Sequence, residues 1–429
     1  MGEHSLESVY RFRGNKFIRY ANITEIKENI CENKKLMDSV WIGGIKDLHG
    51  LKELYHYIDE NASVQEIEIV NSIFFESLMY CEAKHVYIDR FKSLGINFER
   101  LQKLLKQKIM EDKESYPSSI EHLVYEEGFF PMQHMELQVE KLFIAGFKIK
   151  VDESNTLQGL DLVLAKSVTL DSDKKREGYF IISIEMDFNT HILLTMMKHT
   201  NDIEKNAGDS LTLTKAYKEA VQFLEKYINV ECEPRDTKTE WGKLHKFCSD
   251  LDTKLLDDVR EISNSKIKRD TNMFIQKQIK SLELSDKCSK AELEKIEEKI
   301  LAIFAAESIF HDYKANEIVK LAGDKDLMGY LTVCEFDNNR RKSKTGSVGS
   351  LEPLSGTREY HNLMTDFNEA NRIKTFAISW FVDSSKKDVI QTRISTNSSS
   401  FHINCKAHRN LRRREVHLFV DPIIKAIYG

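Results

Sequence analysis

The chain has 429 residues, of which 41% are hydrophobic and 31% charged, and its formal net charge is -5. This length exceeds what one ordinary hydrophobic core can hold, so two or three domains are expected. The longest apolar stretches fall well short of the roughly 18 residues that a membrane span requires. Met1–Arg13 also lacks the apolar core of a secretion signal. The composition therefore argues against a membrane-spanning or secreted chain and predicts a soluble protein.

The seven cysteines are scattered along the chain, and no two of them form a Cys-x-x-Cys pair. Such spacing disfavours both a disulfide framework and a closed zinc site. Reduced thiols in the cytoplasm are the expected state. The high content of Lys, Ile, Asn and Glu suits an AT-rich bacterial or viral genome.

The first part of the chain, residues 1–130, alternates short apolar runs with stretches of helical spacing. The runs Ser39–Ile42, Val64–Val70 and His85–Asp89 read as strands. Leucines and isoleucines recur every three or four residues after the first and third of these runs. The pattern predicts an α/β module with some parallel pairing.

Residues 131–190 change to a period of two. Leu137–Val151, Leu160–Val168 and Tyr179–Phe188 are predicted strands separated by turn-forming residues. An antiparallel β meander is the simplest arrangement.

Residues 191–330 are predicted to be a helical region. Thr237–Glu240 and Ser289–Glu292 have the spacing of capping boxes, in which the first and last side chains satisfy opening backbone amides. Residues 243–300 are highly charged, with Leu or Ile every three or four positions. They suit either amphipathic helices packed on the rest of the protein or an exposed helical hairpin.

Residues 338–356 are nearly devoid of apolar side chains and are predicted to be a flexible basic linker. The remainder, 357–429, is predicted to be a basic α+β domain. Its expected strands are Thr375–Val382, Val389–Thr396, Phe401–Lys406 and Glu415–Val420, with a short helix after Pro422. The whole chain is thus predicted to be a multi-domain α+β protein: an N-terminal α/β module, an antiparallel β meander, a central helical section and a C-terminal mostly-β basic domain.

The C-terminal part carries the opposite charge to the rest. Residues 338–429 hold 16 Lys and Arg against 8 Asp and Glu, a net charge of +8, so residues 1–337 carry -13. Such asymmetry indicates an anionic partner. The expected contacts form two dense groups, Arg340, Arg341 and Lys342 in the first and Lys406, Arg409, Arg412, Arg413 and Arg414 in the second.

Two kinds of partner fit these cations. Lys and Arg neutralise phosphates, so DNA or RNA is one, and the protein would then be an accessory, complex-forming factor. An acidic protein, a second copy or the chain's own acidic body is the other, which would make this a protein-interaction module. The nearby aromatics Trp380, Phe381 and Phe401 are better explained by core packing than by base stacking.

A third hypothesis is a metal-dependent nuclease. Asp161 and Glu185 with Asp187 lie on predicted neighbouring strands, as do the acids with which such enzymes hold Mg²⁺ beside a phosphate. Position 187 is Asp where that class of enzymes most often has Lys, and Lys166 or Lys198 is a possible replacement. Mg²⁺ is the only cofactor implied, and only under this hypothesis.

Three weaker patterns also occur. His191 near Glu185 and Asp187 suggests a transition-metal site, but Asn189 reads as a helix cap between them. Arg412 and His417 have the Arg-x4-His spacing of a class of helical ribonucleases, yet the flanking sequence alternates like a strand. Lys344–Ser350 resembles a phosphate-binding loop in composition only.

Overall fold

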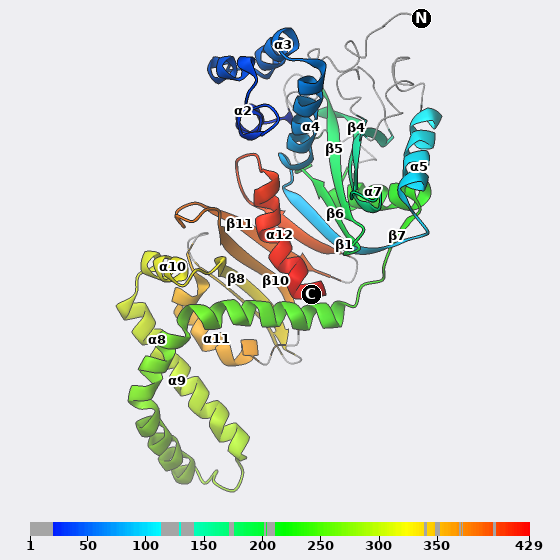
Figure 1. Ribbon diagram of the computed structural model, residues 1–429. Coiled ribbons are helices and arrows are strands. Elements are labelled where there is room, and N and C mark those ends of the chain that lie inside the picture. Colours follow the sequence, from blue (N-terminus) through cyan, green and yellow to red (C-terminus); the bar gives the residue numbers. More distant parts are fainter. Residues whose placement is uncertain are drawn as a thin grey trace, which may run out of the picture. The chain divides into compact units, whose positions relative to one another are not determined.

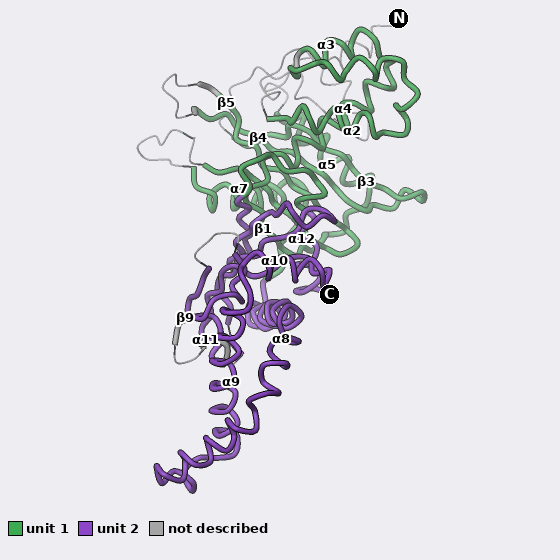
Figure 2. Tube along the Cα trace, turned by 90° about the vertical axis from the view of Figure 1, so that its left-hand side faces the viewer, with its two compact units in different colours: residues 1–234, 407–416 green, residues 235–406, 417–429 purple. Residues whose placement is uncertain are grey.

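The computed structural model describes residues 20–112, 128–129, 141–170, 176–200, 203, 211–338, 341–347, 352–368, 370, 372–397 and 400–429. The chain divides into two compact units (Figure 2). Unit 1 comprises residues 1–234 and 407–416, and unit 2 comprises 235–406 and 417–429. Helices and antiparallel strands make up both units, which confirms the predicted α+β class. None of the described helices is long and apolar enough to cross a membrane.

Unit 1 contains a sheet in the order β2-β3-β4-β5-β6-β1, and β7 pairs with β1. Every pairing described in this sheet is antiparallel, where the sequence predicted some parallel pairing. The strands are β1 (His85–Ser93), β2 (Gly128–Phe129), β3 (Phe143–Val151), β4 (Leu157–Leu170), β5 (Arg176–Asp187), β6 (Ile192–Met197) and β7 (Val230–Cys232). The predicted meander therefore forms, and β6 extends it into the region that was expected to be helical.

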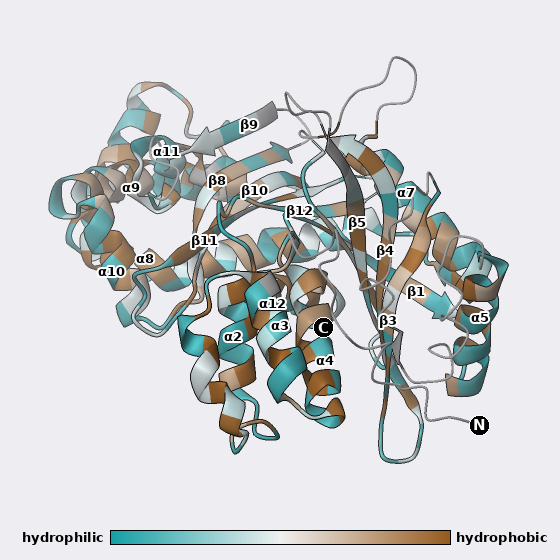
Figure 3. Ribbon diagram, turned by 90° about the horizontal axis from the view of Figure 1, so that it is seen from above, coloured by the Kyte–Doolittle hydropathy of each residue, from teal (hydrophilic) through white to brown (hydrophobic). Residues whose placement is uncertain are grey.

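Helices cover both faces of this sheet. They are α2 (Ile23–Glu32), the 3₁₀ helix η2 (Val40–Asp47), α3 (Leu51–Asn61), α4 (Val64–Tyr80), α5 (Phe98–Glu111), α7 (Leu213–Phe223) and the π-helical turn η5 (Leu224–Ile228). Helix α4 contacts β4 and β5, whereas α5 contacts β3 and α7 contacts β6. Figures 1 and 3 show α4 on one side of the sheet and α5 and α7 on the other. Each of α2, α3 and α4 carries both hydrophobic and hydrophilic residues (Figure 3), as expected for helices packed on one side.

Two of the predicted N-terminal strands are helical. Ser39–Ile42 leads into η2, and Val64–Val70 is the first half of α4. A capping box starts α4, because the Ser63 hydroxyl accepts from the Glu66 amide and the Glu66 carboxylate accepts from the Ser63 amide. Buried Phe74, Phe75 and Leu78 then continue the apolar face with helical spacing. The short alternation that suggested a strand is compatible with a helix once these later residues are counted.

The strands of unit 2 lie in the order β12-β11-β10-β8-β9, and each pairing described among them is antiparallel. Its strands are β8 (Gly329–Asn338), β9 (Arg341–Gly346), β10 (Arg372–Phe381), β11 (Val389–Thr396) and β12 (Phe401–Cys405). Strand β9 pairs with β8 inside the segment that was predicted to be a flexible linker. Trp380, Phe381 and Phe401 are at most 4% exposed, which confirms that they pack in the core.

The helices of unit 2 are α8 (Thr237–Ser281), α9 (Lys290–Asp312), α10 (Ala315–Asp324), the 3₁₀ turn η6 (Leu354–Gly356), α11 (Arg358–Asn368) and α12 (Arg413–Tyr428), whose first residues are counted with unit 1. The predicted strand Glu415–Val420 is part of α12. Val416, Phe419, Val420, Ile423 and Ile427 are all buried and recur every three or four residues, so their burial requires the helical period.

Candidate functional site

Two acidic side chains lie together on neighbouring strands of unit 1. Asp161 on β4 is directly opposite Glu185 on β5 in the antiparallel register. Residues paired in this way project from the same face of a sheet, with their Cβ atoms about 5 Å apart. Asp161 is 7% exposed and Glu185 8% exposed, so the two carboxyl groups share a buried site. Two buried acids side by side repel each other unless a cation or a retained proton neutralises one of them.

The third strand supplies that cation. Lys150 lies on β3, which pairs with β4, and its Nζ is 2.6 Å from Asp161 Oδ1 and 3.5 Å from Glu185 Oε1. The two lysines considered from the sequence lie elsewhere, because Lys166 pairs with Glu219 at 3.1 Å and Lys198 approaches Glu82 at 3.7 Å. Lys150 is therefore the lysine that meets the acid pair.

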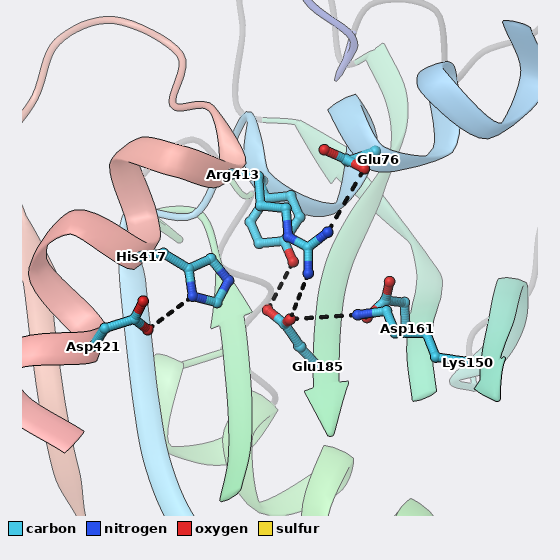
Figure 4. Close-up of polar contacts among 8 residues, drawn as sticks. Glu76, Lys150, Asp161, Glu185, Arg413, His417 and Asp421 are labelled. Atoms are coloured by element: carbon cyan, nitrogen blue, oxygen red, sulfur yellow. Dashed lines mark hydrogen bonds and ion pairs between the residues drawn. The ribbon is translucent and has the colours of Figure 1, made fainter. Parts of the chain in front are cut away.

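Glu185 has further partners beyond the lysine. The Tyr80 hydroxyl, at the end of α4, donates to Glu185 Oε2 at 2.7 Å. The Arg413 guanidinium donates to Glu185 Oε1 at 3.3 Å and lies 4.0 Å from Glu76 Oε2. Figure 4 shows Lys150 and Arg413 approaching Glu185 from different directions. The site therefore combines two acids, two cations and a phenol.

Burial sets the proton affinities of these groups. It raises the pKa of Asp161, and Glu185 raises it further, while Lys150 and Arg413 oppose the shift. Burial, together with the charges of Glu185 and Asp161, raises the pKa of Tyr80 well above its usual value. Tyr80 therefore keeps its proton and acts as a hydrogen-bond donor to Glu185.

Asp187, the third acid named from the sequence, serves a different purpose. Its Oδ1 accepts from the amides of Asn189 at 2.8 Å and Thr190 at 3.2 Å, which shapes the turn between β5 and β6. His191 lies in that turn with a φ of 57°. The described part of the chain contains no group of three or more His, Cys, Asp or Glu side chains placed to hold a metal. Any ion at Asp161 and Glu185 would thus have two protein carboxylates.

Most of the second basic group makes ion pairs inside unit 1. Arg412 lies 2.5 Å from Glu28, Arg409 lies 2.9 Å from Glu415, and Arg413 has the contacts given above. Arg414 in unit 1 and Lys406 in unit 2 are exposed and have no ion-pair partner among the described residues. These two remain the free cations of that group.

The first basic group is less well defined. Arg340 lies outside the described residues, and Arg341 and Lys342 belong to β9, where the structure describes their backbone only.

The Arg-x4-His pattern of Arg412 and His417 lies at the start of a helix. The helix it requires exists as α12, but Arg412 precedes that helix and His417 pairs with Asp421 at 2.9 Å.

The acid pair itself was expected from the sequence, whereas Lys150, Tyr80 and Arg413 were not linked to it. One signal was present, since Lys148 and Lys150 interrupt an otherwise apolar strand. No protein-family model, curated protein or solved structure matches this chain. The interpretation of the site therefore depends on its geometry.

Proposed function

We propose that this protein is a metal-dependent nuclease whose active site is formed by Asp161, Glu185 and Lys150. The observation that carries the proposal is the placement of Lys150 Nζ within 3.5 Å of both paired carboxylates. Two acids and one lysine on three adjacent strands provide the groups that hydrolysis of a phosphodiester with a hard cation needs.

Mg²⁺ suits a pair of carboxylates because this ion commonly keeps several water ligands and takes only one or two acids from the protein. When bound, it would polarise a phosphoryl oxygen and lower the pKa of a bound water. Asp161 and Glu185 would hold the ion. Lys150 would neutralise negative charge that develops on the phosphate.

Tyr80 and Arg413 support this arrangement from outside the acid pair. The Tyr80 hydroxyl orients Glu185 through its hydrogen bond to Oε2. Arg413 is partly exposed, and its guanidinium contacts the same carboxylate. A planar guanidinium can bind two phosphate oxygens at once, so Arg413 is placed to hold the polymer beside the acids.

Cleavage of plasmid DNA and of single-stranded RNA, in Mg²⁺ or Mn²⁺ and in EDTA, tests the proposal. We expect cleavage only with the ion, and a loss of at least about 100-fold in Asp161→Asn, Glu185→Gln and Lys150→Met. Lys148→Met is the matched control, since Lys148 lies on the same face of β3 but is exposed and bonds Ser72 at 3.3 Å. Equal product from all four variants and the wild type would exclude these residues.

A protein-interaction role for the second basic group is the alternative, and the ion pairs of Arg412 with Glu28 and of Arg413 with Glu76 favour it. In that case the group docks on acids of unit 1. A triple change of Arg412, Arg413 and Arg414 to Ala would then lower stability and leave nucleic-acid affinity unaltered. A loss of affinity with unchanged stability would instead favour direct contact with phosphates.

A further inference from the structure

One face of helix α8 carries four cations in the half that is distant from the sheet of unit 2. They are Lys266, Arg269, Lys277 and Lys280, named here the α8 stripe. Successive members are three or eight residues apart, so all four lie on one side of the helix, each within about 40° of the direction of Met273 between them. All four are exposed.

The exposed Asp270 lies on the same face, four residues after Lys266, but no ion pair joins it to the stripe in the described structure. None of its four side chains forms an ion pair or hydrogen bond with a described residue. This differs from the second basic group, in which three arginines are paired with acids. The α8 stripe is therefore a set of cations that is available to bind an external anion.

The α8 stripe is exposed because the opposite face of α8 is buried. Thr271, Ile275 and Ile279 are buried and recur every four residues, and they form the side of α8 that packs on α9. Figures 1 and 2 show α8 and α9 side by side as a hairpin that projects from the rest of unit 2. The stripe lies on the side of α8 that faces away from α9.

The dimensions of the stripe suit a polymer. From Lys266 to Lys280 a helix rises about 21 Å. Phosphates on one strand of duplex DNA recur about every 3.4 Å along the axis, so this length spans several of them. Ile262 and Met273 lie on the same face and are 60% and 56% exposed, and Phe274 beside them is 54% exposed. Apolar and aromatic groups among cations give sugars and bases surfaces to pack on.

We propose that the α8 stripe binds the phosphate backbone of nucleic acid. The stripe itself requires only a polyanion, and the identification of that polyanion as nucleic acid rests on the proposed function. Four unpaired cations on one rigid helix face supply a sequence-independent contact, which suits an enzyme that cleaves a long polymer at many positions. The stripe is the holding surface, and the acid pair of unit 1 is the site of cleavage.

The test measures binding of a labelled single strand and a labelled duplex to the full chain in EDTA, between about 50 and 200 mM salt. One variant changes Lys266, Arg269, Lys277 and Lys280 to Gln. The matched control changes Lys287, Lys299, Lys314 and Lys320 to Gln, which removes the same charge from exposed positions of unit 2 outside the stripe. We expect the stripe variant to bind at least about 10-fold more weakly and its salt slope to fall by about 3 to 4, with the control near wild type.

Equal binding by the two variants would overturn the proposal. So would equal affinity of the wild type for poly-glutamate, or a loss of self-association in the stripe variant without a change in nucleic-acid affinity, since both indicate a protein partner. A conservative variant with Lys266, Lys277 and Lys280 changed to Arg keeps the charge, and it must retain binding. The two proposals can fail separately. Because binding is measured in EDTA, the stripe can bind nucleic acid even if the protein does not cleave it. Conversely, Asp161→Asn can abolish cleavage even if the stripe variant binds nucleic acid as well as the wild type.

Discussion

Replacing Lys150 by Met tests whether its ammonium group neutralises the acid pair. Removing one partner of a buried ion pair costs about 3 to 5 kcal/mol. The Lys150 side chain is 28% exposed while those of Asp161 and Glu185 are each 10% exposed, so partial screening by water places the expected loss near 3 kcal/mol. Urea unfolding at neutral pH measures the loss as a lower midpoint with an unchanged slope.

Two further measurements separate this effect from general damage to β3. The control Lys148→Met should change the free energy of unfolding by no more than about 0.5 kcal/mol, because Lys148 is exposed. Added Mg²⁺ should stabilise Lys150→Met more than the wild type, because the ion no longer competes with an ammonium group. If Lys150→Met is no more destabilising than Lys148→Met, the ammonium group does not neutralise the pair and the argument for the site fails.

Three other outcomes are expected. Burial raises the pKa of Glu25 from 4.5 to about 7, so between these pH values the folded protein retains a proton that the unfolded chain releases. The free energy of unfolding therefore falls as pH rises through this window, by on the order of 3 kcal/mol. Glu25→Gln should remove this loss, which a comparison of urea midpoints at about pH 5 and about pH 8 would show. Arg413→Ala should destabilise unit 1 by about 1 to 3 kcal/mol and Arg414→Ala by less than about 0.5 kcal/mol, as thermal unfolding would show, since Arg413 is ion-paired and Arg414 has no ion-pair partner within the described ranges. Thr392→Val removes the acceptor of a 2.8 Å hydrogen bond from the buried Trp380 indole and should cost about 1 to 3 kcal/mol in chemical denaturation, whereas a cost near zero would mean that the indole finds another acceptor.

Long, strongly patterned segments could be predicted from the sequence. The strands around Asp161 and Glu185 alternate over many residues, and both acids were expected on neighbouring strands, as β4 and β5 confirm. The capping box at Ser289 also marked the start of α9. In each case the signal is local, because capping and alternation depend on residues that are close in the chain.

Short alternating runs were ambiguous for the same reason. Val64–Val70 and Glu415–Val420 fit a period of two over a few residues, yet both are helical. Burial of later residues, such as Phe74 in α4 and Ile423 in α12, decides the period there. That information lies in tertiary packing, which overrides a weak local preference.

Composition determined that the C-terminal part is basic, and the alternating pattern indicated that Asp161 and Glu185 occur on neighbouring strands. Only the tertiary structure decided which cations are used and which are free. Strand register brings Lys150 to Asp161 and Glu185, and folding brings Arg412 to Glu28, while packing of α8 on α9 turns Lys266 and Lys277 outward. Whether two charged groups form an ion pair depends on distances of a few ångströms between residues that are far apart in the chain. Sequence spacing does not give those distances.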